Sequence, residues 1–410
     1  MNTITAAVNE RVNYERARFA PDAENVARGQ QTETVGPLAF PNHIIKGAAG
    51  YYADVLSDCM EPPRHFFFIA YLTCLGALIA DKVKLKSELW IQSRLFAVIL
   101  GESADDRKST AINKTVDFFI NALTTFAVCF GVGSAEGLQR RFQKDTNLLL
   151  VYDELKAFVG KAKVDGSVLL PCVCTLFESN RYESHTKDKE IILTSAFLSI
   201  LAASTIETYE RTWDSAFQDI GMTNRLFIVP GQGKRLHAIP GRVPYEEWDT
   251  MRGDLKRILN GAYITPELDI TPAAKALYET WYLNLEQSVH TKRLDTYALR
   301  FMILLAVNSE KFEIDESITQ DVIDLMNWQL QARRLYDPID ADSAIAKIEE
   351  KIRRVLKAAP RTEYEIKRAV HYSRIGAWAF TNALKNLTNS KEISFDKQAN
   401  RWGLKNEPHH

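Results

Sequence analysis

The sequence contains no apolar run that approaches the roughly eighteen uninterrupted residues of a membrane-spanning helix. Its first residues, MNTITAAVNERVNYERARF, also lack the basic-then-apolar order of a secretion signal. Apolar side chains make up 46% of the 410 residues and charged ones 25%. This is enough apolar material for roughly two or three packed units. We therefore expect a soluble, cytoplasmic protein that does not contact a membrane.

Cysteine is scarce, and the five residues are Cys59, Cys74, Cys129, Cys172 and Cys174. Only the last two are close in sequence, and their Cys-Val-Cys spacing matches neither a zinc knuckle nor a redox pair. Reduced thiols packed among apolar residues are the favoured interpretation. An excess of positive charge is also missing, since the net charge is −1. Any contact with DNA or RNA must therefore come from local basic patches.

Composition and periodicity divide the sequence into five segments. Residues 1–43 are polar with little apolar periodicity and are expected to form a flexible arm. Residues 44–90 show helical spacing interrupted at MEPPRH, which predicts a small unit of two helices joined by a proline turn. Residues 233–338 also show helical spacing, and we expect an all-helical lid.

Residues 91–232 change to short apolar runs separated by amphipathic ones, which indicates an α/β core. Continuous apolar runs suit parallel strands that helices cover on both faces. The expected strands are LFAVIL, FAVCF, LLLVY, FLSILAA and RLFIVP, and the expected helices are 108–124, 134–144 (capped by Ser134), 166–179 and 205–217.

Residues 343–406 predict three helices and then an alternating ribbon, which is the order of a winged helix-turn-helix. Thr362 and Glu365 match a capping box, and Ser373 is positioned to cap the third helix. The apolar residues Trp378 and Phe380 are expected mainly in its core.

Two functions are open for this tail. The first is DNA contact, made by the third helix and by the wing; its candidate residues are Arg374, Lys385, Lys397 and Arg401. The second is protein docking, which winged helices also perform.

The stretch GESADDRKST, residues 101–110, lies between a predicted strand and a predicted helix. A standard phosphate loop reads Gly-x-x-x-x-Gly-Lys-Ser/Thr: backbone N–H groups surround the phosphates, Lys reaches the terminal ones and the hydroxyl holds magnesium. Here six residues instead of five separate Gly101 from Lys108, and Asp106 with Arg107 stands where the second glycine is expected. Taken alone, the stretch is equally compatible with an ordinary polar turn.

A second element lies some forty residues later, where the apolar stretch LLLVY ends in Asp153 and Glu154. A buried strand that ends in two carboxylates presents one to magnesium and the other to an attacking water. A strand followed by a solvated acidic turn is the alternative. The order of strand, Lys-Ser-Thr helix start and strand ending in Asp-Glu favours a nucleotide site over coincidence.

Two later strands carry further candidates. FLSILAAST ends in Ser204 and Thr205, in the place of a polar residue that senses the nucleotide beside the acidic strand. Arg225 starts the last core strand, where a fixed arginine could contact the γ-phosphate on a neighbouring subunit. The alternatives are a helix N-cap for Ser204 or Thr205 and a surface ion pair for Arg225.

Together these motifs resemble the helicase-like P-loop ATPases of the RecA/AAA+ type that phages, plasmids and other mobile elements carry. Members often have a degenerate loop Gly-x-Ser/Thr-x-x-Gly-Arg-Lys-Gly/Ser-Thr, which GESADDRKST matches except at Asp106. The resemblance covers roughly residues 40–335 and includes GSAEGLQRRFQKDTNLLLVYDEL and GMTNRLFIVPG. It implies a P-loop NTPase core of the ASCE/AAA+ type with a helical lid, and ATP and Mg²⁺ as cofactors.

The resemblance also implies roles for single residues. These are Lys108 and Arg107 on the phosphates beside Gly101, Ser109 and Asp153 on Mg²⁺ with Thr110 next to them, Glu154 as the catalytic base, Ser204 or Thr205 as the sensor, and Arg225 as the arginine finger of the next subunit. The negative charge of Asp106 opposes a triphosphate, and Arg107 can offset it.

Two other regions resemble parts of related hexameric motors. KRLDTYALRFMILLA is similar to a helix that supplies a second sensing arginine, with Arg293 and Arg300 as candidates; a solvated helix face is the alternative. SNRYESHTKDKEIIL lies where such motors project a hairpin into the central pore, so Arg181, Lys187 and Lys189 would touch DNA phosphates. A solvated polar hairpin is the alternative there.

The expected function is therefore an ATP-dependent DNA motor of a mobile element, either a replicative helicase or the ATPase part of a replication initiator. The expected partners are single-stranded or forked DNA, further copies of the chain in a hexameric ring, and a primase or another replication protein. Two alternatives stay open: a non-unwinding ATPase that loads or clamps on DNA, and a DNA-binding scaffold whose nucleotide loop has decayed.

Overall fold

The computed structural model describes residues 38–102, 106–185, 190–213, 217, 219–338 and 344–405. Contacts divide the chain into two units, Met1–Ala39 and Phe40–His410. Nearly all of the first unit, for which the sequence predicts a flexible arm, lies outside the described residues. The second unit begins with the short 3₁₀ helix η1 (Asn42–Ile44). No helix within the described ranges is long and apolar enough to cross a bilayer.

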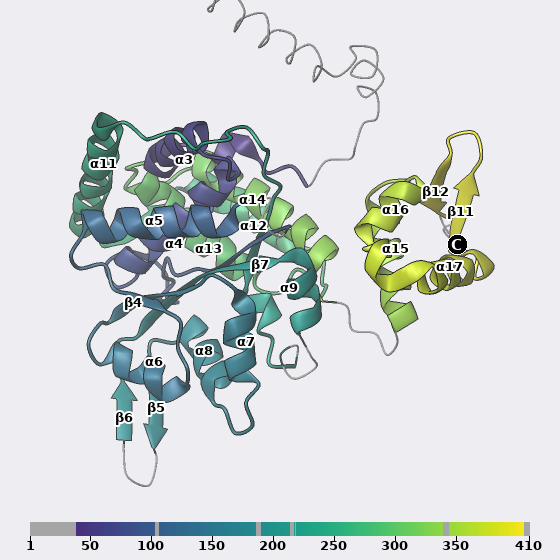
Figure 1. The fold of residues 1–410 in the computed structure, drawn as a ribbon. Coiled ribbons are helices and arrows are strands. Elements are labelled where there is room, and N and C mark those ends of the chain that lie inside the picture. Colours follow the sequence, from purple (N-terminus) through teal and green to yellow (C-terminus); the bar gives the residue numbers. More distant parts are fainter. Residues whose placement is uncertain are drawn as a thin grey trace, which may run out of the picture. The chain divides into compact units, whose positions relative to one another are not determined.

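A parallel sheet of five strands forms the centre of the second unit (Figure 1). In spatial order the strands are β3 (Val128–Phe130), β4 (Asn147–Tyr152), β7 (Phe197–Thr205), β2 (Phe96–Gly101) and β8 (Phe227–Pro230). The expected mixed α/β core with buried parallel strands is confirmed. The three central strands are buried along almost their whole length, which is why their sequences are continuously apolar.

Helices cover both faces of this sheet (Figure 1). One face carries α4 (Arg64–Ile79) and α5 (Lys108–Ala122), with α3 (Gly47–Cys59) packed on α4. The other face carries α7 (Leu155–Ala162), α8 (Leu169–Glu178) and α9 (Ile206–Thr212), and α6 (Ala135–Phe142) packs beside α8. As predicted, the Ser134 hydroxyl caps α6 by accepting from the Gly137 N–H at 3.2 Å.

The structure does not contain the separate helical unit expected at residues 44–90. Helix α4 contacts the central strands directly and is buried on nearly every side, from Phe66 to Ile79. A helix that is apolar all round belongs inside a core rather than on a peripheral unit. The helices α3 and α4 therefore belong to the α/β core.

The segment expected to form an all-helical lid, residues 233–338, also contains strands. It contains α11 (Tyr245–Ile264), α12 (Pro272–Leu283), α13 (Leu294–Asn308) and α14 (Glu316–Tyr336). Between them, β9 (Glu267–Ile270) and β10 (Glu313–Ile314) join β1 (Lys84–Leu85) in a second parallel sheet of three strands. Strands of two to four residues are too short to interrupt a helical pattern in the sequence.

Helix α14 covers the free edge of β8. The buried Arg333 guanidinium donates to the carbonyls of Asn224 at 3.1 Å and Leu226 at 3.2 Å. The Gln329 amide, turned to suit both partners, donates to the Ile228 carbonyl at 2.8 Å and accepts from its N–H at 3.1 Å. Side chains of the lid thus satisfy the backbone groups that an edge strand leaves unpaired.

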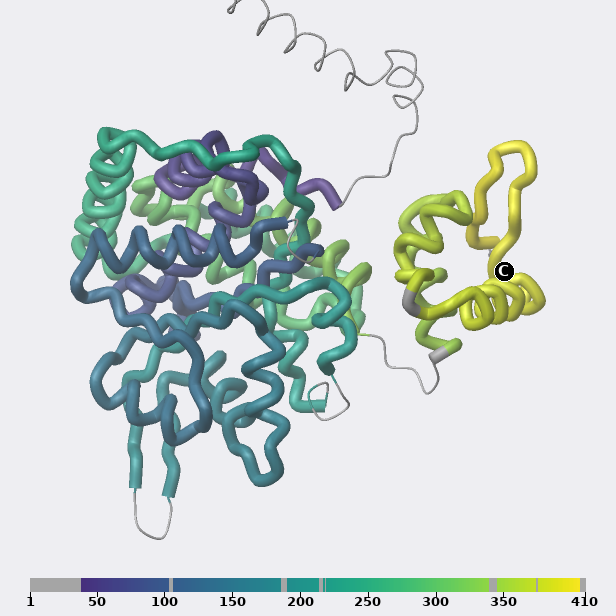
Figure 2. The backbone as a smooth tube through the Cα atoms, viewed as in Figure 1, coloured from purple at the N-terminus to yellow at the C-terminus, as the bar shows by residue number. Residues whose placement is uncertain are grey.

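A hairpin of β5 (Tyr182–His185) and β6 (Glu190–Leu193) projects from the side of the core that carries α6 and α8 (Figure 2). The short 3₁₀ helix η2 (Thr223–Arg225) leads into β8. The C-terminal part consists of α15 (Ala344–Ala358), α16 (Glu363–Ala369), α17 (Tyr372–Asn389) and the antiparallel pair β11 (Ile393–Asp396) and β12 (Arg401–Leu404).

This C-terminal part has its own apolar core, which includes Ile352, Ile366 and Phe380. The predicted capping box between Thr362 and Glu365 is present. The cap expected at Ser373 is not, because α17 already begins at Tyr372 and its N-cap residue makes no side-chain bond.

Candidate functional site

The carboxyl ends of three neighbouring strands bring the predicted site residues to one edge of the central sheet. Strand β7 pairs with β2 on one side and with β4 on the other. In this register Gly101 lies beside Thr205, and Tyr152, the last residue of β4, lies beside Ala202. The loop after β2 consists of residues 101–107, of which 103–105 lie outside the described residues. Its described residues, the acidic pair after β4 and the hydroxyl residues at the end of β7 therefore share the edge where ligands bind in open α/β sheets.

Lys108 is the first residue of α5, and its side chain is folded over the loop. Only 8% of the residue is exposed. Its Nζ donates to the carbonyls of Gly101 at 3.2 Å and Glu102 at 2.6 Å. Burial lowers the pKa of this amine, while the charges of Asp106, Glu154 and Glu102 act in the opposite direction. The ammonium thus lies in the field of three carboxylates.

The acidic pair is held by its neighbour strand. Asp153 directly succeeds β4 and is exposed, whereas Glu154 is partly buried. The Ser204 hydroxyl donates to Glu154 Oε1 at 3.1 Å. Thr205 instead caps α9, since its hydroxyl accepts from the Thr208 N–H at 3.0 Å. Of the two sensor candidates, Ser204 is the one that contacts the acidic pair.

Ser109 and Asp153 are the hydroxyl and carboxylate that the sequence proposes as magnesium ligands, and both are exposed. No group of three or more His, Cys, Asp or Glu residues capable of holding a metal occurs in the part of the chain that the structure describes. Magnesium bound with a nucleotide takes one or two protein carboxylates together with phosphate oxygens and water. The donor set therefore fits magnesium that arrives with a triphosphate.

Asp106, which replaces the expected glycine, points into the loop. It is 1% exposed. Its Oδ1 accepts from the Gly233 N–H at 2.6 Å, and its Oδ2 accepts from the Glu102 N–H. Arg107 has a positive φ of 49° and turns the other way, so that its Nε donates to Glu61 Oε2 at 2.9 Å. Arg107 therefore neutralises Glu61 in this state rather than a phosphate.

A segment that sequence reasoning did not single out covers the loop. We call residues 231–237, which come after β8, the strap. Its first N–H, from Gly231, donates to the Leu100 carbonyl at 3.0 Å. A Cβ on Gly231 would lie 2.5 Å from the Phe66 ring and 2.6 Å from the His65 ring, so only glycine fits this close approach. The signal in the sequence is PGQGK directly after the last core strand.

Glu61 connects the strap to Arg107. Its Oε1 accepts from the N–H groups of Leu236 at 3.2 Å and His237 at 3.3 Å. The hydrogen bond from Arg107, aided by these two N–H groups, lowers the pKa of Glu61. This carboxylate thus stays ionised and bridges the loop and the strap.

Two of the predicted arginines lie at the opposite, amino-terminal edge of the sheet. Arg225 and Arg293 stand over the same Phe177 ring, with distances of 5.9 and 5.5 Å to its centroid. Arg225 donates to the carbonyls of Ile220 and Gly221, and Arg293 pairs with Glu178. The strands between the two edges span roughly 20 Å. Within one chain, neither arginine reaches the loop.

Arg300 requires a correction. It is 4% exposed, and its guanidinium donates to the carbonyls of Arg94 at 2.9 Å and Phe177 at 2.6 Å. Burial lowers the pKa of Arg300 to about 10. Both terminal nitrogens of Arg300 are bound to carbonyls inside the core, so its guanidinium is not presented to a nucleotide in this structure.

The hairpin candidates are only partly described. Arg181 is exposed just before β5, whereas Lys187 and Lys189 lie outside the described residues. His185 faces Glu183 at 3.5 Å and Glu190 at 3.0 Å. The described part of the hairpin is therefore not a basic surface.

The C-terminal part is strongly basic. Residues 344–405 contain fourteen Lys and Arg against six Asp and Glu, a net charge of +8 in a chain whose total is −1. Lys385 and Lys397 are exposed and Arg401 is partly exposed. The Arg374 side chain lies outside the described residues. The positive charge of the chain is therefore concentrated in this segment.

The expectation that Trp378 packs in the core is wrong, because this residue is 73% exposed. The buried face of α17 is formed by Phe380, Ala383 and Leu387. Residue 378 precedes Phe380 by two positions, roughly 200° around the helix, and so lies on the outer side. Tyr364, near the start of α16, is 75% exposed.

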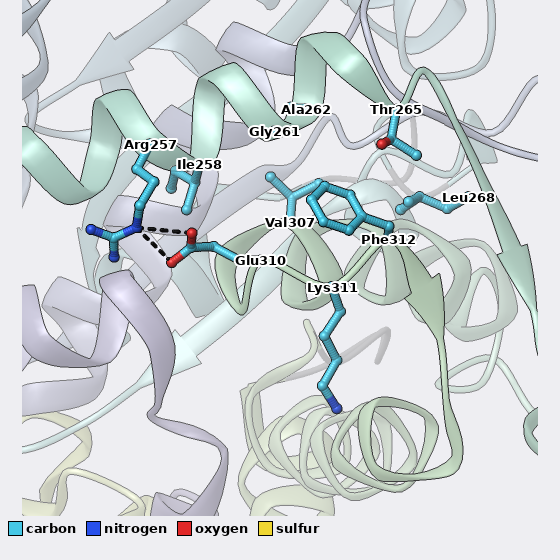
Figure 3. A pocket seen from close by; sticks show the side chains of 10 residues that line it. All are labelled: Arg257, Ile258, Gly261, Ala262, Thr265, Leu268, Val307, Glu310, Lys311 and Phe312. Atoms are coloured by element: carbon cyan, nitrogen blue, oxygen red, sulfur yellow. Dashed lines mark hydrogen bonds and ion pairs between the residues drawn. The ribbon is translucent and has the colours of Figure 1, made fainter.

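A small pocket lies elsewhere, between α11 and the turn from α13 to β10 (Figure 3). Its lining is mostly apolar, with Phe312 and Ile258 among the side chains, and Arg257 is paired with Glu310 at its rim at 2.8 Å. None of its lining residues belongs to the loop, the acidic pair or the strap.

No family model matches this sequence, and no curated protein matches it.

Proposed function

We propose that this protein is an ATP hydrolase that binds Mg-ATP at the carboxyl edge of its central sheet and acts on DNA. One observation carries the proposal: Lys108 begins the helix after β2, and Glu154, held by Ser204, stands at the end of β4 on the same edge. A lysine at a helix N-terminus and a fixed carboxylate near it are the parts that phosphoryl transfer to water requires.

The roles derive from the chemistry of each group. The N-terminus of α5 and Lys108 would bind the β- and γ-phosphates. Ser109 and Asp153 would hold Mg²⁺, which when bound neutralises charge on these phosphates. Glu154 would orient the attacking water and accept its proton, and the hydrogen bond from Ser204 keeps the carboxylate in one orientation.

An oligomer is part of the proposal because the arginine candidates lie at the wrong edge for their own loop. Arg225 and Arg293 would contact the triphosphate of a neighbouring subunit, so that each site lies between two chains. A head-to-tail contact of this kind generates a ring when it closes, and the resemblance to hexameric motors favours six subunits. Activity is then expected to rise with protein concentration.

The basic C-terminal part supports DNA as the partner. Its three helices and hairpin have the order of a winged helix-turn-helix, and its net charge of +8 suits a polyanion. The exposed Trp378 and Tyr364 add aromatic surfaces on which unpaired bases stack. Among DNA-dependent ATPases, the resemblance favours a replicative helicase or the ATPase part of a replication initiator of a mobile element.

The scaffold alternative also has an observation in its favour. Asp106 fills the loop and Arg107 is paired with Glu61, so neither residue presents charge to a phosphate in this state. A loader or clamp, which uses ATP without unwinding, has the same site and differs from a motor only in the step after hydrolysis.

The test is ATP hydrolysis with and without single-stranded DNA for the wild type, Lys108→Ala and a control, Lys114→Ala, which removes an exposed lysine from the same helix. We expect DNA-stimulated turnover that is lost only in Lys108→Ala. Absence of both turnover and nucleotide binding in the wild type would reject the proposal and favour the scaffold.

Two further experiments separate the ATP-dependent functions. Glu154→Gln is expected to keep ATP-dependent assembly while losing turnover. Strand displacement on a forked duplex then distinguishes a motor from a loader, because only the motor separates the strands.

A further inference from the structure

We propose that the Asp106 carboxylate is an internal anion in the phosphate-binding loop, and that a nucleotide binds by displacing it. The inference rests on the proposed function, because it concerns the regulation of that same site. It makes Asp106 the residue that sets nucleotide affinity.

Backbone N–H groups donate to the Asp106 carboxylate. Two backbone N–H groups bind it, one on each oxygen: Glu102 in the loop donates to Oδ2 and Gly233 in the strap donates to Oδ1. Backbone N–H groups are also the donors with which such loops hold phosphate oxygens. These N–H groups therefore bind an anion, and in this structure the anion is the Asp106 carboxylate.

The Asp106 carboxylate is buried against the backbone of the loop. A Cβ on Gly101 would lie 2.6 Å from Asp106 Oδ2, so the carboxylate lies directly against the backbone of the loop. The residue is almost fully buried. A solvated acidic residue at the rim would repel a triphosphate from a distance, whereas this one occupies the space that a phosphate needs.

The ammonium of Lys108 already has hydrogen-bond partners within the loop. Lys108 Nζ donates to two carbonyls of the loop and lies in the field of Asp106. A terminal phosphate would have to take over this ammonium as well as the N–H of Glu102. Once Asp106 leaves, the Lys108 charge is free to pair with the incoming phosphate.

The strap gives the displacement a consequence beyond the loop. Its Gly233 N–H is bound to Asp106, and its Leu236 and His237 N–H groups are bound to Glu61. Departure of Asp106 releases the strap at Gly233 and leaves it attached through Glu61. Nucleotide binding would therefore free one end of the strap to move, and the strap continues toward α11.

Competition with Asp106 multiplies the intrinsic affinity by the small fraction of molecules in which the carboxylate has already left its N–H donors. Removing the internal anion should therefore tighten nucleotide binding, whereas removing a mere structural brace should weaken it. The two explanations predict opposite signs for the same substitution.

The experiment is calorimetric titration of the full chain with ATP and with inorganic pyrophosphate. Asp106→Asn removes the charge at constant size, and Asp106→Gly restores the glycine of the related loops. Asp117→Asn, an exposed carboxylate on α5, is the matched control. We expect both Asp106 variants to bind both ligands about tenfold more tightly or better, and the control to bind like the wild type.

The outcomes separate this inference from the proposed function. Tighter binding in the Asp106 variants than in a wild type that binds ATP supports the inference. Equal or weaker binding than a wild type that does bind ATP rejects the inference and leaves the proposed function standing. No binding in any protein rejects both.

A second variant decides the matter if the Asp106 variants do not fold. Glu61→Gln weakens the other attachment of the strap and the ion pair with Arg107 while leaving Asp106 in place, and we expect it to lower the Kd for ATP by a few-fold. An unchanged or raised Kd in this variant overturns the inference.

Discussion

Ser204 lies on β7, Glu154 lies two residues after the end of the adjacent strand β4, and the serine hydroxyl donates to the glutamate Oε1 at 3.1 Å. Ser204 is itself almost fully buried, so it has few other conformations available. The position of the proposed base is thus set by a side chain from the strand that separates the acidic strand from the loop strand.

Ser204→Ala should lower kcat for ATP hydrolysis by about tenfold while KM changes little, because Glu154 loses its orientation and not its charge. Steady-state kinetics measure both constants. Thr205→Ala is the paired variant: it should cost about 1 kcal/mol of stability through loss of the α9 cap and leave kcat nearly unchanged. A kcat that falls only in Thr205→Ala would transfer the role to that residue.

Lys108→Ala and Arg225→Ala should each be inactive alone and recover activity when mixed. In mixed oligomers, some interfaces combine an intact loop from one subunit with an intact arginine from the next. With random mixing in a head-to-tail ring, about a quarter of the wild-type activity is expected. Hydrolysis measured over a range of mixing ratios checks this, and no recovery at any ratio would argue against a site between subunits.

Arg300→Met should destabilise the protein by about 2–5 kcal/mol, because two buried carbonyls lose their guanidinium donor and remain desolvated. Urea unfolding gives the loss. Where the variant remains folded, its KM for ATP should match the wild type; a raised KM would make Arg300 a nucleotide contact after all.

Stability should decrease at acidic pH because of His65. Burial lowers the pKa of His65 to about 4 from 6.5, although its hydrogen bond to the Pro230 carbonyl acts the other way. The unfolded chain therefore binds a proton before the folded one, so this stabilisation is complete above pH 6.5 and is lost as the pH falls toward 4.

Between pH 7 and 5 the loss due to His65 should reach about 1–2 kcal/mol. Urea unfolding at several pH values measures it, and His65→Gln should show a smaller slope over the same range. Equal slopes in the two proteins would assign the pH dependence to other groups.

Trp378→Ala should weaken binding to single-stranded DNA by about tenfold or more, with less effect on duplex, because stacking needs an unpaired base. Fluorescence anisotropy with matched oligonucleotides measures both. The salt dependence should stay as in the wild type, whereas Lys385→Ala and Lys397→Ala should each reduce its slope by about 1. An equal loss on both DNA forms would indicate a structural role for Trp378.

The central sheet was predictable because β4, β7 and β2 are buried on both faces and therefore consist of continuous apolar runs. The short strands β1, β9 and β10 were not, because two to four residues carry no period. The strap was missed for a related reason: it is held by backbone N–H groups, which the side-chain sequence does not reveal.

The residues of the site illustrate the same limit. The order of motifs was sufficient to bring Lys108 and Glu154 to one edge, because parallel strands end together. The direction of the Asp106 side chain depends on the conformation of a single loop, and no pattern encodes it. The sequence does indicate that Arg300 is buried, since it lies within α13, whose neighbouring positions are nearly all apolar.

The contacts of α14 with the edge of β8 bear on how the chain is made. Gln329 comes 101 residues after Ile228, so a ribosome synthesises the whole strand long before its covering helix exists. Until then the newly made sheet ends in an open row of N–H and C=O groups, a template for pairing with other nascent chains. Residues 91–232 expressed alone would keep that open edge, and we expect them to aggregate more readily than the full chain.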